Sequence, residues 1–429
     1  MMEERRKNTM ILYRNLRYQQ LFDDMCSLLK PEEGGARPDA YACASQLIDL
    51  AVTYGFRGNL WHCFLAFCMA NNENAYSTSC EIIGPVGGSL SELARHDFAQ
   101  VRELFSLDIA RLDEAENGIW SEMKHYENAL ENSKAFNHRI RDRIVELSVS
   151  LENAESDQEF QDIVTEFYKE FGVGKFGLNK AFHIIMDDEA KQVDIEPITR
   201  VEHIELNDLV GYELQKAKLI ENTEAFIEGR AANNCLLFGD SGTGKSSSIK
   251  AILNQYYDRG LRMIEVYKHQ FRGLSDVLEQ IKDRNYKFII YMDDLSFEEY
   301  ELEYKYLKAV IEGGLEKKPD NVLIYATSNR RHLIRETFKD KEDRDEELHT
   351  NDTVQEKLSL VARFGVTIYF GRPQKREFQE IVCQLAKRNN LNLTEEELLA
   401  EANKWELSHG GMSGRTAQQF IDYLAGKEA

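Results

Sequence analysis

The chain contains the stretch Gly239-Asp240-Ser241-Gly242-Thr243-Gly244-Lys245-Ser246, which fits the pattern G-x-x-x-x-G-K-[ST] of a phosphate-binding P-loop. A short apolar run, Cys235-Leu236-Leu237-Phe238, precedes it and predicts a buried strand, and residues 247–257 after it predict a helix. Glycines let such a loop wrap its backbone N–H groups around a phosphate, and the start of the helix adds the positive end of a dipole. The strand–loop–helix order therefore predicts a nucleotide-phosphate site.

Two side chains of this loop have separate predicted tasks. Lys245 is expected to reach the β- and γ-phosphates, and the Ser246 hydroxyl is expected to bind Mg²⁺. The other predicted nucleotide contacts in the loop are Gly239, Asp240, Ser241, Gly242, Thr243, Gly244 and Ser247.

The composition indicates a globular chain of two or three domains, given 429 residues and a prior of about 150 residues per domain. The net charge of −21 argues against strong generic binding to nucleic acid, although it leaves room for a local basic patch. The first residues lack the apolar core of a signal peptide, and the seven cysteines include no CxxC pair. The most apolar run, residues 60–70, is far shorter than the roughly 20 residues of a membrane span. We therefore expect a cytoplasmic protein that does not cross a membrane.

The pattern of apolar residues divides the chain into three parts. Residues 1–190 predict an all-α N-terminal domain, and the polar stretch 188–200 predicts a linker. Residues 191–371 alternate strands with helices, which predicts an α/β domain with a parallel sheet. Residues 372–429 predict three helices and no strand. The strands expected in the α/β part are 234–238, 262–266, 287–292, 321–326 and 366–370, with helices at 246–257, 274–284, 304–313 and 354–361.

Two acidic residues, Asp293 and Asp294, follow the apolar strand expected at 287–292. An acidic residue at the carboxyl end of a strand beside a P-loop is where Mg²⁺ is held, which assigns Asp293 to the metal. Asp294 stands where a carboxylate could orient or deprotonate the attacking water, or where it could only cap the next turn. Because Asp is one methylene shorter than the Glu more usual at this place, slow turnover or a long-lived ATP-bound state is compatible with the pair.

A polar side chain also follows the next expected strand, 321–326, within Thr327-Ser328-Asn329. A side chain at this strand end would face the γ-phosphate from the side opposite the P-loop. We therefore predict that Asn329 holds the nucleophilic water.

In this order, the residues resemble the motifs of the AAA+ ATPase superfamily over residues 205–425. The matching positions are 208–212 ahead of the P-loop, 239–246, Asp293-Asp294, Asn329, Arg363 in Ala362-Arg363-Phe364, and Gly414-Arg415. The resemblance implies that Val210 and Gly211 line an adenine pocket. It also implies ATP and Mg²⁺ as ligands, ATP hydrolysis, a P-loop NTPase sheet of five strands with a C-terminal helical lid, and a nucleotide-dependent homo-oligomer.

The resemblance gives different tasks to two arginines. Arg363 matches the position of an arginine finger, whose guanidinium stabilises charge on the nucleotide of a neighbouring subunit and is worth ~10³–10⁵ in rate. Arg363 could instead be a surface arginine before a strand, and Arg330 and Arg331 are rival candidates. Arg415 would touch the nucleotide of its own chain and convert the ATP state into a lid angle.

A narrower resemblance covers residues 288–297 (FIIYMDDLSF), residues 325–333 (YATSNRRHL) and the helical N-terminal half. These stretches are similar to an uncharacterised bacterial ATP-binding family that is catalogued as a domain of unknown function. This similarity adds little about the task of the protein.

Three functions are compatible with these features. The first is an ATP-hydrolysing AAA+ protein that remodels or assembles an unknown protein partner through its helical N-terminal domain. The second is a nucleic-acid-associated loader or initiator, which the Asp293-Asp294 pair favours slightly and the acidic charge opposes. The third is a signalling switch that binds ATP and rarely hydrolyses it. GTP specificity is disfavoured because no N-K-x-D follows the P-loop, and a protein-threading pore has Phe271-Arg272-Gly273 as its single candidate loop.

Overall fold

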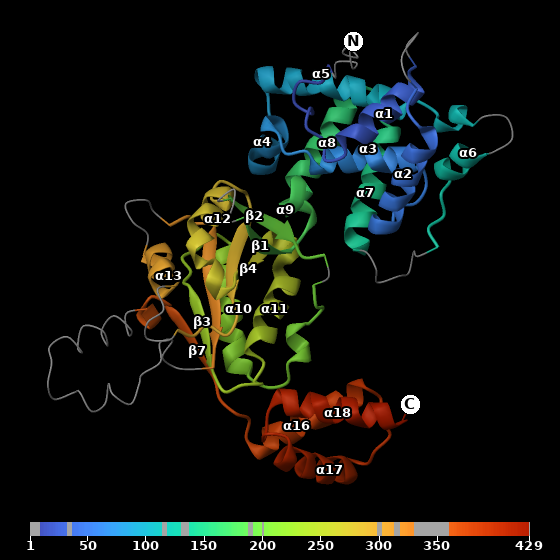
Figure 1. Cartoon of the computed structure of the whole chain (residues 1–429). Coiled ribbons are helices and arrows are strands. Elements are labelled where there is room, and N and C mark those ends of the chain that lie inside the picture. Colours follow the sequence, from blue (N-terminus) through green and yellow to red (C-terminus); the bar gives the residue numbers. More distant parts are fainter. Residues whose placement is uncertain are drawn as a thin grey trace. The chain divides into compact units, whose positions relative to one another are not determined.

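The chain forms two compact units, Met1–Asn179 and Lys180–Ala429, in the computed structural model (Figure 1). The structure describes residues 9–31, 37–113, 118–129, 137–187, 192–199, 201–297, 303–312, 318–329 and 360–428. Within these ranges, none of the helices combines the length and the apolar character that a membrane crossing requires.

The first unit is helical, as expected, and its core surrounds helix α3 (Leu60–Asn71). The residues of α3 from Leu60 to Ala70 are all buried, which explains why this helix is apolar on every side. The side chain of Asn59 caps its start by accepting hydrogen bonds from the N–H groups of Trp61 and His62. The other helices of this unit are α1 (Gln19–Leu29), α2 (Ala40–Tyr54), α4 (Ala75–Ile83), α5 (Gly88–Phe105), α6 (Ile119–Lys124), α7 (His138–Glu152), α8 (Asp157–Phe171) and α9 (Gly174–Leu178).

Two strands lie where the sequence pattern predicted the end of the helical domain and a linker. Strand β1 (Ala181–Asp187) pairs with β2 (Gln192–Pro197) in an antiparallel hairpin, and β1 also pairs in parallel with β4 (Leu261–Glu265). The prediction of helix up to residue 190 and of a linker at 188–200 was therefore wrong. Residues 181–187 belong to the sheet, so the boundary between the two units lies at 179/180 and not at 190.

The second unit contains a seven-stranded sheet of order β2-β1-β4-β5-β6-β3-β7. The five parallel strands that the sequence predicted are present as β3 (Cys235–Gly239), β4, β5 (Lys287–Met292), β6 (Val322–Ser328) and β7 (Val366–Phe370). The predicted total of five strands was wrong, because the β1–β2 hairpin adds two more beside β4. Since β3 pairs with β6 and β6 pairs with β5, the carboxyl ends of these three strands meet at one edge of the sheet.

Helices cover both faces of this sheet (Figure 1). Apolar side chains of α10 (Glu213–Ile227) and α11 (Lys245–Tyr256) share one buried cluster with residues of β3, β5 and β6. Helices α12 (Leu274–Ile281) and α13 (Glu303–Glu312) lie on the opposite face. Of the helix predicted at 354–361, residues 354–359 fall outside the part of the chain that the structure describes.

The three helices predicted after the sheet are confirmed as α16 (Lys375–Arg388), α17 (Glu395–Ser408) and α18 (Gly414–Glu428). They pack around an apolar cluster of their own, which includes Phe378, Leu398 and Phe420. Thr394 and Glu397 form the capping box at the start of α17, in which each side chain pairs with the other residue's backbone N–H. This separate core makes the three helices a distinct layer beside the sheet.

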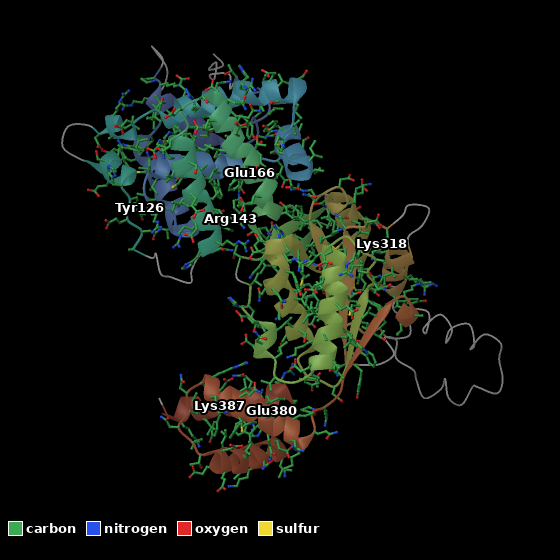
Figure 2. All side chains as sticks on the ribbon, turned by 180° about the vertical axis from the view of Figure 1, so that it is seen from behind. Tyr126, Arg143, Glu166, Lys318, Glu380 and Lys387 are labelled. Atoms are coloured by element: carbon green, nitrogen blue, oxygen red, sulfur yellow. The ribbon has the colours of Figure 1, made fainter. Side chains whose placement is uncertain are left out.

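One half-buried lysine lies just before β6, away from the P-loop. Figure 2 shows the side chains of both units and labels this residue, Lys318. Its amine donates a hydrogen bond to Oδ1 of Asn234 at 2.6 Å, and burial lowers the pKa of Lys318 to about 8.

Candidate functional site

The P-loop follows β3 and ends where α11 begins at Lys245. Gly239 has φ of +133°, and a Cβ at this position would lie 2.1 Å from the carbonyl oxygen of Phe370 in β7. No other residue type fits so close to a neighbouring strand. Gly239 therefore lets the loop leave the sheet while β3 stays paired with β7.

The amine of Lys245 lies at the centre of the loop. It donates hydrogen bonds to the carbonyl oxygens of Gly239 and Asp240, at 3.0 and 2.6 Å, and to Oδ1 of Asn329 at 3.0 Å. The residue is only 6% exposed. Burial lowers the pKa of Lys245, and the carboxylates of Asp294, Asp240 and Asp293 offset part of that shift. A buried ammonium held by neutral acceptors is well placed to exchange them for phosphate oxygens.

Asp293 directly follows β5 and accepts two short hydrogen bonds at one oxygen. The hydroxyl of Ser246 donates at 2.7 Å and the hydroxyl of Thr327 donates at 2.6 Å, both to Oδ1. Burial raises the pKa of Asp293, but the hydrogen bonds from the Thr327 and Ser246 hydroxyls oppose this effect, and the pKa lies below its ordinary value. The carboxylate is consequently ionised at neutral pH.

Asp294 adopts φ of +48°, in the left-handed region that few residues other than glycine enter. Its backbone N–H donates to the hydroxyl of Thr327 at 2.9 Å. Its side chain accepts a hydrogen bond from Nδ2 of Asn329 at 2.8 Å. Because Asn329 also accepts from Lys245, this one amide connects the P-loop with the acidic pair.

These side chains open onto a cavity of about 860 Å³. The cavity brings together most of the residues that the sequence predicted, from five separate segments of the chain. The predicted residues that line it are Val210, Ser241, Gly242, Thr243, Gly244, Lys245, Ser246, Ser247, Asp293, Asp294, Asn329 and Arg415. The predicted residues that are not part of its lining are Gly211, Gly239, Asp240 and Arg363.

The residues outside the lining have other positions in the fold. Gly211 lies between Val210 and Tyr212, both of which do line the cavity. The backbone N–H of Asp240 donates to the carbonyl of Phe370 at 2.9 Å, and its carboxylate accepts from the N–H of Arg372 at 3.0 Å. Asp240 thus fixes the chain that leaves β7 towards α16.

Arg363 lies just before β7 and is not among the residues that line this cavity. The rival candidates Arg330 and Arg331 lie outside the described residues.

The C-terminal helices contact the P-loop directly. The backbone N–H of Arg415 donates to the carbonyl of Gly242 at 3.2 Å. Gly242 has φ of +76°, and a Cβ there would lie 3.0 Å from Oγ of Ser413 and 3.1 Å from Cβ of Arg415. At the other end of the cavity, Arg388 of α16 donates to the carbonyl of Asp208 at 2.8 Å. The start of α18 and the end of α16 therefore both contact residues that line the cavity.

Sequence reasoning missed several residues of this cavity. Lys216 of α10 lines it, and its amine donates to the carbonyl of Leu209 at 2.8 Å while pairing with Glu213. Thr327 lines it as well, between the two acidic residues. The one signal for Thr327 was its place two residues before Asn329, because residues two apart in a strand face the same side. The i,i+3 spacing of Glu213 and Lys216 was a local signal for their ion pair, but nothing in the sequence placed Lys216 at this cavity.

The donor set of Ser246 and Asp293 fits Mg²⁺. Magnesium binds in proteins through one or two carboxylate or hydroxyl oxygens, together with substrate phosphates and water. In the described part of the chain, no group of three or more His, Cys, Asp or Glu could hold a metal by itself. Ser246 and Asp293 are therefore the residues that would hold Mg²⁺, with nucleotide phosphates and water as its other ligands.

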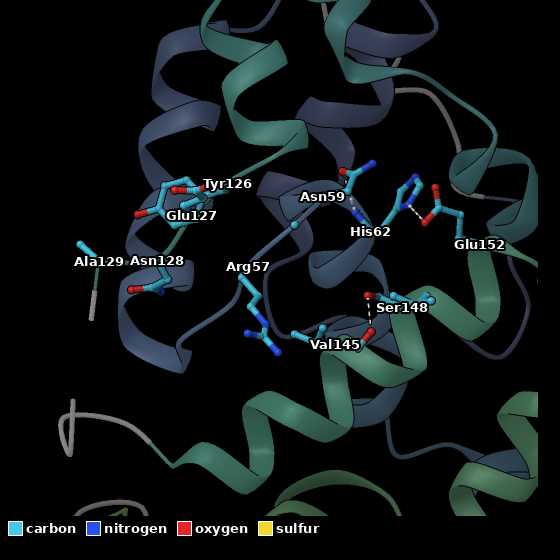
Figure 3. A pocket seen from close by; sticks show the side chains of 12 residues that line it. Arg57, Asn59, His62, Tyr126, Glu127, Asn128, Ala129, Val145, Ser148 and Glu152 are labelled. Atoms are coloured by element: carbon cyan, nitrogen blue, oxygen red, sulfur yellow. Dashed lines mark hydrogen bonds and ion pairs between the residues drawn. The ribbon is translucent and has the colours of Figure 1, made fainter. Parts of the chain in front are cut away.

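A second cavity, of about 760 Å³, lies in the helical unit (Figure 3). One side of it is a stripe of α7 that includes Val145, Val149 and Glu152. On the other side lies His62, which is 5% exposed and has Nδ1 3.5 Å from a carboxylate oxygen of Glu152. Burial lowers the pKa of His62, although Glu152 opposes this shift. This cavity therefore has an apolar wall and a polar end.

The strand order β4-β5-β6-β3-β7, the P-loop after β3 and the three helices after β7 define an AAA+ ATPase-like fold. The family model described as "Protein of unknown function (DUF815)" matches residues 179–428, and the chain belongs to this family.

Two solved structures that resemble the chain do so at low identity. A RuvB mutant of Thermotoga maritima is 15% identical over 53% of this chain and 68% of its own, with a TM-score of 0.37. The FIGL-1 AAA domain in complex with ADP is 17% identical over 53% of this chain and 74% of its own, also with a TM-score of 0.37. A search of curated proteins gave no match.

Proposed function

We propose that the chain binds ATP with Mg²⁺, hydrolyses it, and uses the cycle to remodel or assemble a protein partner. One observation carries the proposal: Lys245, the acidic pair and Asn329 come from three adjacent strand ends and meet in one cavity. Phosphoryl transfer depends on positioned charges and oriented water more than on covalent chemistry by the protein. The charges of Lys245 and the acidic pair support this proposal, and Asp294 with Asn329 would orient the water.

Each residue has a defined part in the proposed reaction. Lys245 binds phosphate oxygens, and Ser246 and Asp293 hold the metal, which neutralises charge on the phosphates when it is bound. Asp294 accepts a proton from the attacking water, and Asn329 keeps Asp294 and that water in place. Arg415 contacts the phosphates from the C-terminal helices, which act as a lid.

The Mg²⁺-dependent ATPase activity of the full chain tests this proposal. We expect Asp294→Asn to bind ATP normally and to lose hydrolysis by roughly 10²–10⁴-fold, because a general base contributes about that much. Asp276→Asn, on the exposed side of α12, is a matched control and should retain activity. Full activity of Asp294→Asn would remove Asp294 from the mechanism.

We propose the helical unit as the part that recognises the partner. The cavity of Figure 3 supports this, since Val149 is an exposed apolar residue at its wall. A partner protein captured with the Asp294→Asn variant in the presence of ATP should no longer be captured with the Asp294→Asn/Val149→Glu double variant. The basal ATPase should not change with Val149→Glu alone, because this residue belongs to the other unit.

A slow ATP-controlled switch is the second candidate. It is favoured by the hydrogen bond between Asp294 and Asn329, which occupies the carboxylate that should activate water. If hydrolysis of ATP in a single turnover is far slower than release of unreacted ATP, the switch is supported.

A nucleic-acid-associated role is the third candidate, and it requires ATPase stimulation by DNA with a steep salt dependence. We also propose a homo-oligomer and a cytoplasmic location, the latter because the cysteines are all free thiols.

A further inference from the structure

Thr327 contacts three consecutive residues of the acidic turn. Its hydroxyl donates to Oδ1 of Asp293 at 2.6 Å and accepts from the N–H of Asp294 at 2.9 Å. Its carbonyl oxygen accepts from the N–H of Leu295 at 2.7 Å. Thr327 is only 2% exposed and is the second-to-last residue of β6. Its side chain is therefore held in place by the sheet.

The register of the sheet explains these contacts. Met292 at the end of β5 pairs with Ala326 of β6, so the residues that follow each strand lie side by side. Thr327 lies in β6 and Asn329 follows the end of that strand, two residues further on. The first contacts Asp293 and the second contacts Asp294. One strand end thus holds both carboxylates.

The backbone of Asp294 needs such support. A non-glycine residue at φ of +48° costs free energy, and this conformation persists only where surrounding contacts require it. Thr327 provides contacts on both sides of the strained residue, through its hydroxyl and its carbonyl oxygen. Without the hydroxyl, the N–H of Asp294 loses its partner and the turn can relax.

We propose that the Thr327 hydroxyl is the positioning group that sets Asp293 to bind the metal and Asp294 to face the water. This inference rests on the proposed ATPase function and adds a residue to it. The hydroxyl suits this task because it donates one hydrogen bond and accepts another at the same time. Valine has the same shape and neither capacity, whereas serine keeps both.

The proposal separates metal binding from nucleotide binding. The P-loop contacts of Lys245 do not involve Thr327, so a nucleotide without metal should bind equally well when the hydroxyl is lost. The metal should bind less tightly, because groups that orient a metal ligand are typically worth about 10–100-fold in metal affinity.

The test uses the full chain with a non-hydrolysable ATP analogue. The affinity for Mn²⁺ is measured by electron paramagnetic resonance, the affinity for the analogue is measured in EDTA, and Tm is recorded for each protein. Thr327→Val should weaken Mn²⁺ binding by about 10-fold or more and leave the affinity in EDTA within about twofold. Thr327→Ser should bind Mn²⁺ like the wild type. Thr367→Val, at an exposed position of β7, is the matched control.

The outcomes are distinguishable. Wild-type Mn²⁺ affinity in Thr327→Val would overturn the inference alone. Equal losses in Mn²⁺ and in metal-free binding that serine does not restore would also overturn it, since they would indicate a purely structural role. A wild-type chain that binds no analogue under either condition would overturn the proposed function and this inference with it. If Thr327→Val does not fold, Thr327→Ala provides the same comparison.

Discussion

The amine of Lys245 lies 3.0 Å from Oδ1 of Asn329, although 84 positions separate the two in the chain. The other end of the same amide donates to Asp294 at 2.8 Å. Asn329 therefore links the group proposed to bind phosphate with the group proposed to activate water. A nucleotide that draws Lys245 onto its phosphates must change the contacts of Asn329 as well.

Asn329→Ala should uncouple binding from hydrolysis. We expect kcat to fall by about 10²–10³-fold, the usual effect of losing one positioned hydrogen-bond donor at a reacting centre. The affinity for ATP should change by less than about tenfold, because Lys245 keeps its other partners and gains the phosphates. Steady-state kinetics and equilibrium binding measure the two effects. Asn389→Ala, at the exposed end of α16, is the control, and an unchanged kcat in Asn329→Ala would refute its role.

Arg363→Ala should bind ATP and fail to hydrolyse it, with a loss of ~10³–10⁵ in rate if its guanidinium acts on a neighbouring subunit. Mixing it with Lys245→Ala should then restore part of the activity. In a mixed assembly, the first variant supplies an intact cavity and the second supplies an intact arginine. Activity is measured over a range of mixing ratios. The absence of rescue at every ratio would count against action between subunits.

Gly242→Ala should weaken ATP binding because a methyl group there presses on Ser413 and Arg415 at the start of α18. Gly229→Ala is a matched control, since Gly229 has a similar φ of +73° and open space around its missing Cβ. Both variants should lose about 1 kcal/mol of stability from backbone strain. Only Gly242→Ala should also lose ATP affinity in calorimetric titration. Equal affinities in the two variants would show that the contact with α18 does not shape the cavity.

Local pattern was enough to predict the P-loop, the five parallel strands and the three C-terminal helices, because each has its own periodicity and turn residues. The β1–β2 hairpin was missed because its strands are short and flank a polar stretch that resembled a linker. Residues such as Val193 and Ile195 did alternate with polar neighbours, which is the strand signal that could have revealed it. Thr327 was missed for another reason: its partners Asp293 and Asp294 are set by the register of β5 and β6, which no single segment encodes.

Lys318 should make stability depend on pH between about 8 and 10. Burial lowers its pKa to about 8, whereas a lysine in the unfolded chain titrates near 10.4. Between these values the unfolded state binds one more proton than the folded state, so the free energy of unfolding rises with pH. The full rise from this residue is at most about 3 kcal/mol. Lys318→Met lacks this titration. The difference in the free energy of unfolding between this variant and the wild type, measured by denaturant unfolding, should therefore change with pH.

The control for that experiment is Lys375→Met, at the exposed start of α16. Its difference from the wild type should be constant over the same pH range. A constant difference for Lys318→Met as well would show that Lys318 carries an ordinary charge in the folded protein.

Binding of ATP to the full chain tests the central claim most directly. Calorimetric titration should show binding by the wild type and by Lys250→Ala, whose amine lies in the same helix and pairs with Glu202. Lys245→Ala should lose at least about 100-fold in affinity, because its amine supplies the charged hydrogen bonds to the phosphates. If Lys245→Ala binds ATP as tightly as the wild type, the cavity at the carboxyl ends of β3, β5 and β6 is not the nucleotide site.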